Sequence, residues 1–438
     1  MKSDHTHIHE IILFTGLLVS ILALPFSILL CHLGILIILL NWIAQRNWSK
    51  KWETLKKTPT VIFFVLYFTW LVIGTFYSEE LANAWFNVEK KFTFAVVPVV
   101  LATSTLSEKN KNLLYQAFVL CCGIGVLICL GSAIQRVYIN SDLTALNFGA
   151  TQPALLLINP LFSQDWQHFS YVALASGIGI HPTYFAIYII FCICIVVLQY
   201  NTGKFNGYTT IALIGFFILF LALLSTRITF MVILIIALVG LIRASKKVTQ
   251  TSIKKLAIGG TFVFLFLVLT ALNPISLYRE FQEINATNFD IRKNTEYTNS
   301  TEIRLSLWWA GLKTVLQSNP IVGSGSGDTQ LEMNKTLKAY SISNSLNSHD
   351  PHNQFINTFI STGLIGLILL LGCYLYPVRQ AWLQKNFLQL SFIGLVLLVS
   401  LTESFLESQK GIVFFVIFQS LALTGSQLPH TGPKIAVL

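Results

Sequence analysis

The residue with the clearest chemical potential is His352, which follows Asp350 and Pro351 just before a long apolar run. An Asp-Pro pair fits a helix N-cap followed by proline at the first helical position. The sequence therefore predicts His352 and Asn353 in the first turn of a helix, where positive partial charge favours anions and disfavours an imidazolium. A neutral imidazole there could accept a proton from a hydroxyl group. From position alone, a helix-end histidine bonded to loop backbone is the simpler interpretation.

Two arginines are candidates for binding a phosphate, because the guanidinium fork donates two parallel hydrogen bonds. Arg227 opens an apolar run, where an arginine is costly unless it reaches the interface or meets an anion. Arg304 stands in a polar segment, where a solvated charge is the ordinary interpretation. His349 and His181 are secondary candidates, and His349 could replace His352 as a base.

Glu403 and Glu407 stand four residues apart near the end of another apolar run, with Lys410 close behind. The simplest interpretation is a helix-end cluster paired with Lys410. The glutamates could instead orient an acceptor or pair with Arg227. The chain has no Asp-x-Asp pair, no Walker A loop and no Gly-x-Ser-x-Gly elbow, so we expect neither a metal nor a cofactor.

The elements that must position these residues are membrane helices. Of the 438 residues 54% are hydrophobic and 11% charged, and soluble domains carry about twice that charged fraction. The net charge of +10 lies in short clusters between apolar runs, which favours membrane loops over nucleic-acid binding. The seven cysteines fall inside apolar runs, so they are predicted to act as small hydrophobic residues.

The apolar runs predict an all-α, polytopic transmembrane bundle of about twelve spans. Pro25 leaves open whether the first two runs form a hairpin or one kinked span. The predicted spans are 11–24, 26–43, 59–76, 92–106, 113–137, 171–200, 209–224, 228–242, 256–272, 353–376, 387–405 and 411–424.

The distribution of charge predicts which side of the membrane each loop occupies. With twelve spans, the side that holds both termini carries 17 of the 29 basic residues and four acidic ones. Because basic residues concentrate in short cytoplasmic loops, both termini are predicted in the cytoplasm. Two long loops, near 138–170 and at 273–351, then lie outside.

The chain divides at the second long loop. Residues 1–272 hold spans 1–9, residues 273–351 form the large outer loop, and residues 352–438 hold spans 10–12 and a cytoplasmic tail. The large loop contains one clear helix, because Ser300 or Thr301 can cap it and an apolar stripe follows at helical spacing. The stripe consists of Ile303, Leu307, Ala310 and Val315, and Pro320 and Gly323 end the helix.

Several motifs together resemble the O-antigen ligase and polymerase family. The central one is His352-Asn353, nine residues, then Gly363-Leu-Ile-Gly366-Leu367. The stretch before it runs from Arg304 through Trp308-Trp309 to Asn319-Pro320-Ile-Val-Gly323-Ser-Gly325. Three upstream segments also have family counterparts: Trp85 with Glu89-Lys90-Lys91 and Pro98, His181-Pro182-Thr183-Tyr184, and Ser225-Thr226-Arg227. The resemblance covers most of the chain in order.

The resemblance implies a metal-independent, inverting glycosyltransferase of the bacterial inner membrane whose active site faces the periplasm. Its donor would be a glycan on undecaprenyl diphosphate, with Arg227 and Arg304 binding the diphosphate and His352 acting as base. Asn353 and Tyr184 join the secondary candidates. For a ligase the acceptor is lipid A-core or a related surface molecule. For a polymerase it is another lipid-linked repeat unit.

A polysaccharide transporter or flippase is a further alternative. Such a protein would be expected to show repeated halves and charges deep within its spans. The sequence shows no internal repeat, and its charges cluster at the ends of the predicted spans. Partners on any of these interpretations are lipid-linked glycans and membrane lipid, and no nucleic acid.

Overall fold

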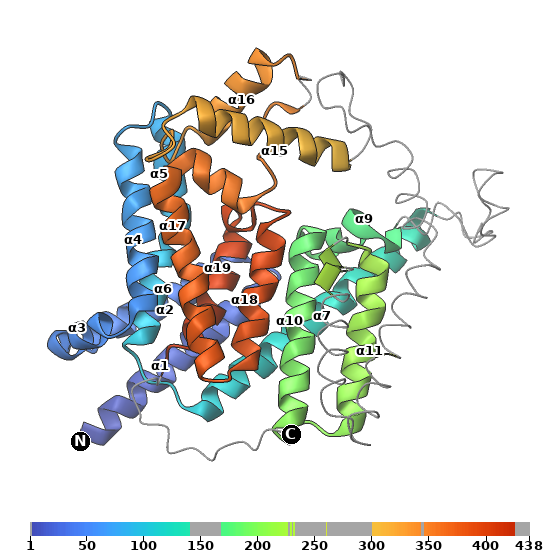
Figure 1. Ribbon diagram of the computed structural model, residues 1–438. Helices are drawn as coiled ribbons and strands as arrows, with labels where there is room; N and C mark the ends of the chain where they lie inside the picture. Colours follow the sequence, from blue (N-terminus) through green and yellow to red (C-terminus); the bar gives the residue numbers. More distant parts are fainter. Residues whose placement is uncertain are drawn as a thin grey trace.

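The computed structural model describes residues 2–140, 168–226, 228–229, 231–232, 260, 300–342 and 346–424. Within these residues every regular element is a helix and none is a strand, which confirms the predicted all-α class. Figure 1 shows a bundle of helices with a helical layer across one end.

The first half of the chain contributes helices α1 to α11. Their bounds are α1 Lys2–Ala23, α2 Ile28–Ala44, α3 Trp48–Lys56, α4 Pro59–Thr75, α5 Leu81–Lys91, α6 Thr93–Ala102, α7 Glu108–Asn140, α9 Tyr171–Ala175, η2 Ser176–Ile178, α10 Pro182–Asn201 and α11 Gly207–Leu224. The second half contributes the elements that surround the candidate site. Their bounds are α15 Ser300–Gln317, α16 Thr329–Ala339, α17 Gln354–Leu383, α18 Phe387–Ser400, η4 Phe405–Glu407 and α19 Gln409–Leu421.

Four helices among the described residues are long and apolar enough to cross a membrane, namely α7, α10, α11 and α17. A fifth is counted if the bent pair α2 and α3 is one span. Shorter apolar helices lie in α1, α4, α18 and α19. The chain is therefore a membrane protein with several apolar helices, and the count of about twelve membrane spans stays a prediction.

The predicted span boundaries differ from the structure most clearly at residues 171–200. The predicted span 171–200 is wrong, because two short helical turns, α9 and η2, occupy its first residues and only α10 is long. Pro182 stands in the first turn of α10, which fits a helix start rather than a helix interior. The predicted spans 228–242 and 256–272 lie almost entirely outside the described residues.

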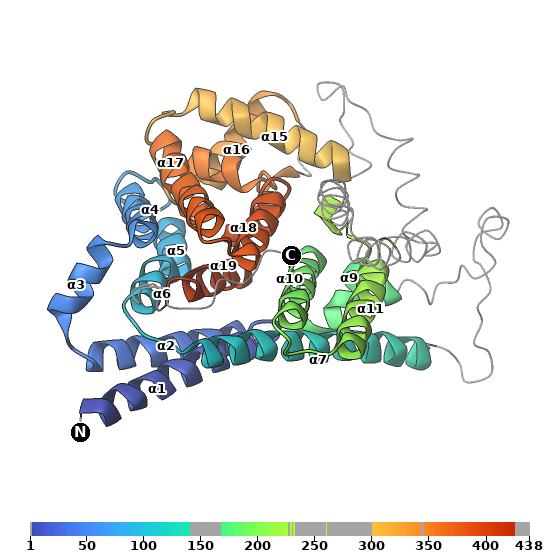
Figure 2. The ribbon, with the colours of Figure 1, turned by 60° about the horizontal axis from the view of Figure 1, so that its bottom comes forward.

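The structure resolves the ambiguity at Pro25 in favour of a hairpin. The backbone N–H groups of Phe26 and Ser27 both donate to the Ala23 carbonyl, which closes a tight turn between α1 and α2. Further along, Ser20 Oγ donates to the Cys31 carbonyl across the pair, at 3.0 Å. The two apolar runs are thus packed side by side (Figure 2).

Helix α19 forms the centre of the bundle. Every residue from Gly411 to Leu421 is buried, and a helix that is apolar on all sides belongs in a core. Aromatic rings fill the space around it: Phe418 lies 4.7 Å from Phe118 of α7 and 5.0 Å from Phe191 of α10, measured between ring centroids. All seven cysteines are free, and six of them are buried while Cys194 is partly buried, as expected of small hydrophobic residues.

Helices α4 and α17 run antiparallel and thereby define the two ends of the bundle. Thr60, near the start of α4, donates to the Gln380 side chain near the end of α17. Trp70, near the end of α4, donates to the Thr362 carbonyl in the first half of α17, at 2.9 Å. The loops before α17, after α4 and after α18 therefore share one end, which α15 and α16 cover (Figure 1).

The predicted loop helix is confirmed as α15. Leu307, Ala310 and Val315 are buried in one small apolar cluster, with Ile303 packed against it. The sequence analysis missed α16, whose Met333 and Leu337 complete the same cluster. The pair rests on α17 through Ile360, so the polar segment between the bundle helices is a folded cap.

Candidate active site

His352 lies just outside the helix in which it was predicted. Asn353 is the N-cap of α17, because its Oδ1 accepts from the N–H groups of Phe355 and Ile356 at 2.9 and 3.1 Å. Asp350 Oδ1 instead accepts from the N–H of His352 at 2.8 Å, and His352 has φ 45°. The prediction of an Asp350 cap was therefore wrong: Asp350 closes a local turn that ends with a capping asparagine.

The His352 imidazole faces Glu403, and Glu403 also faces Arg304. His352 Nδ1 lies 3.1 Å from Glu403 Oε2, and Arg304 Nη2 donates to Glu403 Oε1 at 2.8 Å. The Glu403 side chain is 9% exposed, whereas Arg304 is 23% and His352 31% exposed. The buried carboxylate of Glu403 thus holds two partly accessible groups, Arg304 from α15 and His352 from the turn before α17.

The electrostatics of this trio make His352 more basic than an ordinary histidine. The hydrogen bond to Glu403 raises the pKa of His352 and outweighs the opposite effect of burial. Burial raises the pKa of Glu403, but the His352 hydrogen bond and the Arg304 charge outweigh it and hold that pKa below its usual value. The expected disfavouring of imidazolium by a helix end was wrong, because the ring meets a carboxylate instead of helical N–H groups.

The pairing also selects a ring nitrogen. A hydrogen on Nδ1 donates to Glu403 and leaves the lone pair on Nε2 able to accept a proton. Trp308 Nε1 donates to the His352 carbonyl at 3.4 Å, which ties the backbone of His352 to α15. Asn353 Nδ2 donates to the Leu401 carbonyl at 2.9 Å, which ties the same turn to the loop of Glu403.

His181 and Tyr184 line the same region from the start of α10. Their rings pack edge to face at 5.8 Å, and Tyr184 stacks on Phe405 at 4.8 Å. Burial lowers the pKa of His181, while the nearby Glu403 charge works in the opposite direction. The structure therefore places both secondary candidates close to Glu403, in a cluster of aromatic rings beside it.

His349 is close to His352 but makes different contacts. The two ring centroids are 6.5 Å apart. The His349 N–H donates to the Leu346 carbonyl, and its own carbonyl accepts from Gln330 Nε2. Its described bonds thus involve backbone, whereas His352 pairs through its ring. Arg227, the other predicted diphosphate ligand, lies outside the described residues.

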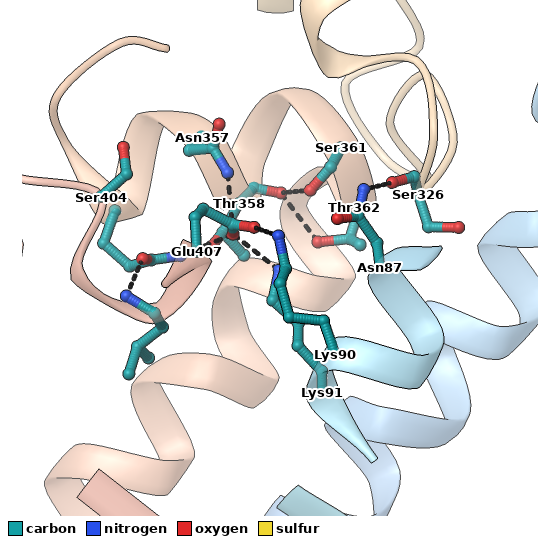
Figure 3. A network of polar contacts seen from close by, with 12 residues as sticks. Asn87, Lys90, Lys91, Ser326, Asn357, Thr358, Ser361, Thr362, Ser404 and Glu407 are labelled. Atoms are coloured by element: carbon teal, nitrogen blue, oxygen red, sulfur yellow. Dashed lines mark hydrogen bonds and ion pairs between the residues drawn. The ribbon is translucent and has the colours of Figure 1, made fainter. Parts of the chain in front are cut away.

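Glu407 belongs to a second polar cluster. Lys91 Nζ lies 2.6 Å from Glu407 Oε1 and Lys90 Nζ lies 3.2 Å from Oε2, so both lysines reach across from α5 (Figure 3). Asn357 Nδ2 and Gln354 Nε2 of α17 donate to Oε1 at 2.9 and 3.3 Å. Burial raises the pKa of Glu407, but Lys91 and Lys90 outweigh it and lower that pKa to about 2.

The predicted pairing of both glutamates with Lys410 is wrong. Lys410 Nζ donates to the carbonyls of Pro25 and Gly179, at 3.1 and 3.3 Å. Helix α18 ends at Ser400, so Glu403 stands in a turn and Glu407 in the short helix η4. The two side chains therefore enter different clusters, although they are only four residues apart.

The two lysines of α5 are charged residues near the site to which the sequence analysis gave no role. Both belong to the Glu89-Lys90-Lys91 segment, which was already part of the family resemblance. Lys91 is 4% exposed, and a lysine is almost never that buried without a partner. Sequence spacing could not reveal the partner, because Glu407 follows more than 300 residues later.

The glycine motifs explain how the cap is fixed above the site. Helix α17 is interrupted at Gly363, which has φ 63° and ψ −165°. The N–H groups of Leu364 and Ile365 bond to the carbonyls of Pro320 and Ile321. In return, the carbonyls before the break, at Ile360 and Ser361, accept from Ser324 and Gly325 at 2.8 and 3.0 Å.

Side chains larger than hydrogen do not fit this crossing. A Cβ on Gly323 would lie 2.5 Å from the Gly363 nitrogen, and a Cβ on Gly363 would lie 2.3 Å from the Ile321 oxygen. The same loop is tied to α5, because Asn87 Nδ2 donates to the Ser326 carbonyl at 2.8 Å (Figure 3). The two glycine motifs therefore meet in space and hold α15, α17 and α5 in one arrangement.

The comparison with protein families agrees with these motifs. A family model described as O-Antigen ligase matches residues 210–371, which include α15, α16 and the first half of α17. A comparison with curated proteins gives no match. The matched range contains Arg304 and His352, whereas Lys91, Glu403 and Glu407 fall outside it.

The apolar helices and the match over residues 210–371 support one class of protein, the membrane glycosyltransferases of the O-antigen ligase and polymerase type. The resemblance of this chain to the O-antigen ligase family is thereby confirmed.

Proposed function

We propose that this protein transfers a glycan from undecaprenyl diphosphate to the hydroxyl of lipid A-core or a related surface acceptor. The observation that carries the proposal is the buried Glu403 carboxylate, which holds the basic ring of His352 and the guanidinium of Arg304 together. A base and a phosphate-binding cation are the two groups that this transfer needs side by side.

In the proposed reaction, His352 Nε2 takes the proton of the acceptor hydroxyl. The acceptor oxygen attacks the anomeric carbon of the donor sugar, and the bond from that carbon to the diphosphate oxygen breaks, with inversion at the carbon. The electron pair leaves with undecaprenyl diphosphate. Glu403, bonded to Nδ1, stabilises the imidazolium that forms during the step.

The leaving diphosphate needs positive charge, and we assign this role to arginine rather than to a metal. Arg304 bonds Glu403 through Nη2 and is partly exposed, so its remaining N–H groups can donate to phosphate oxygens. Arg227 is proposed as the second diphosphate ligand. Transfer should therefore persist in EDTA, and activity that is lost in EDTA and restored by a divalent cation would contradict this assignment.

We propose that the site faces the periplasm of a bacterial inner membrane and that both termini are cytoplasmic. The arrangement of α4 and α17 supports this orientation, because the basic segment 46–57 lies at the end opposite His352. The large loop 273–351 would then be periplasmic, between transmembrane parts 1–272 and 352–438. Cysteine labelling at Asn299 in intact cells tests it, since labelling only after lysis would reverse the orientation.

A polymerase is the second candidate, because the family resemblance includes both activities. The same base and arginine would then join two lipid-linked repeat units, and the acceptor would be a sugar hydroxyl at the non-reducing end. Deletion of the gene separates the two. A ligase mutant accumulates polymerised glycan on the lipid carrier, whereas a polymerase mutant accumulates single repeat units. Single units on the carrier would overturn the ligase assignment.

The direct test of a transferase is a purified system. The protein in detergent, lipid-linked glycan and acceptor should yield glycosylated acceptor and free lipid diphosphate. Translocation of the lipid-linked glycan across vesicles without a new glycosidic bond would instead identify a flippase and would overturn the proposal.

A further inference from the structure

Helix α3 carries exposed tryptophans and basic residues at the end of the bundle away from His352. Helices α2 and α3 meet at 115°, so α3 turns sharply aside from the direction of the preceding apolar helix (Figure 1). The turn is made by Arg46 and Asn47, which both have positive φ, of 54° and 52°. Left-handed conformations at two adjacent non-glycine residues are uncommon. The sharp change of direction between α2 and α3 is therefore made by these two residues.

The inner face of α3 is anchored by a buried lysine. Lys51 is 5% exposed, and its Nζ donates to the Trp42 carbonyl at 2.5 Å. The same ammonium lies 4.3 Å from the Trp42 ring centroid and 4.9 Å from that of Trp48. On the same face Leu55 packs against the buried side chains of Val61 and Ala102. These contacts fix which side of the helix points outward.

The outer face combines tryptophan with positive charge. Trp48 and Trp52 lie one turn apart and are 51% and 61% exposed. Lys56 Nζ lies 5.4 Å from the Trp52 ring centroid. The exposed charged residues of this segment are Arg46, Lys50, Glu53, Lys56 and Lys57, so cations outnumber anions four to one.

The neighbouring helix ends repeat this composition. Thr60, just after α3, bonds to Gln380 of α17, which places the end of α17 beside the start of α4. Trp382 and Phe387 there are 70% and 56% exposed. Exposed aromatic rings with adjacent cations are typical of the headgroup level of a bilayer, where the ring is partly buried and the charge reaches phosphate.

We propose that α3 lies in the headgroup layer and binds anionic phospholipids. Trp48 and Trp52 would sit at the acyl boundary, and Lys50, Lys56 and Lys57 would contact headgroup phosphates. Each lysine close to an anionic surface strengthens such binding about five-fold. This proposal rests on the membrane character of the protein and is independent of the glycosyltransferase assignment.

Quenching of tryptophan by brominated lipid tests the proposal in the full-length protein. One set of vesicles contains acyl-brominated phosphatidylglycerol in plain phosphatidylcholine, and the matched set contains brominated phosphatidylcholine in plain phosphatidylglycerol, at equal bromine density. Because the chain has nine tryptophans, the Trp48→Phe/Trp52→Phe variant is subtracted to isolate the signal of α3. We expect stronger quenching of α3 by brominated phosphatidylglycerol.

The lysines are then removed in one variant, Lys50→Gln/Lys56→Gln/Lys57→Gln. The expected result is loss of the headgroup preference while quenching itself persists. The matched control is Lys313→Gln/Lys335→Gln/Lys338→Gln, which removes three charges from the α15–α16 cap and should keep the preference. If the triple variant of α3 fails to fold, high salt on the native protein should weaken the preference in its place.

Three outcomes would overturn the proposal. Equal quenching by both brominated lipids would mean that α3 contacts the bilayer without a preference for anionic headgroups. Absence of quenching would place α3 against another protein or in water. A preference that survives both the lysine replacements and high salt would assign it to a different part of the chain.

Discussion

Two glutamates, four residues apart, differ in what surrounds them: the Glu403 side chain is 9% exposed and that of Glu407 is 18% exposed. Glu403 faces a histidine and an arginine that are each partly exposed, with side-chain exposures of 31% and 23%. Glu407 faces two lysines that are 11% and 4% exposed. The Glu403 carboxylate thus holds groups that can reach a substrate, whereas the lysines that Glu407 holds are themselves largely buried.

The difference in partners indicates a difference in role. A carboxylate on Nδ1 of an imidazole sets the tautomer and the basicity of that ring, which is useful to a proton transfer. A carboxylate between lysines and amides neutralises buried charge and joins α5, η4 and α17. Breaking such a pair costs stability because it leaves an uncompensated charge. We therefore assign Glu403 to the reaction and Glu407 to the framework.

The largest effect is expected at His352. His352→Ala should lower transfer by about 10²–10⁴-fold, the usual contribution of a positioned general base, with folding intact. The measurement is transfer of purified lipid-linked glycan in detergent, normalised to folded protein. His349→Ala is the control, since that ring lies 6.5 Å away and was left outside the proposed chemistry. A larger defect in the control would mean that the wrong histidine has been named.

The next effect is expected at Glu403. Glu403→Gln keeps the shape but removes the charge, and a hydrogen bond to a charged group is worth about ten- to hundred-fold in rate. Because Glu403 raises the pKa of His352, and a base acts when deprotonated, activity of the native protein should rise with pH above the ordinary histidine range. In Glu403→Gln that rise should move to lower pH. An unshifted profile would separate Glu403 from the reaction.

A smaller effect is expected at Arg304. Arg304→Lys keeps a positive charge near Glu403 but loses the planar fork, so we expect transfer to fall about ten-fold with normal membrane levels. The same replacement at Arg227 tests the second proposed ligand. Product assays on both variants decide the matter, and full activity in both would remove the arginine contribution to diphosphate binding.

The smallest effect on turnover is expected at Glu407. Glu407→Gln should leave transfer per folded molecule nearly unchanged while lowering thermal stability, because Lys90 and Lys91 lose their counter-charge. Thermal unfolding in detergent, followed alongside the transfer assay, provides both readouts. A loss of turnover as large as that of Glu403→Gln at unchanged stability would erase the distinction between the two clusters.

Several features could be predicted from the sequence because they depend on local order. Apolar runs predicted membrane helices, and spacing along one stretch predicted α15 with its buried stripe. The motifs around His352 and Arg304 predicted a family that the match over residues 210–371 confirms. Such signals need only neighbouring residues, since helix periodicity and family motifs are written within a few turns of chain.

Tertiary structure decided the pairing of charges and the start of α17. Glu403 stands 99 residues from Arg304 and 51 from His352, so no local pattern could show that they meet. At the start of α17, Asp350 and Asn353 both suit a cap, and the bond of Asn353 to Leu401 favours the asparagine. Partners brought together by packing set the tautomer, the pKa and the burial of each group, and these quantities separate a reactive cluster from a structural one.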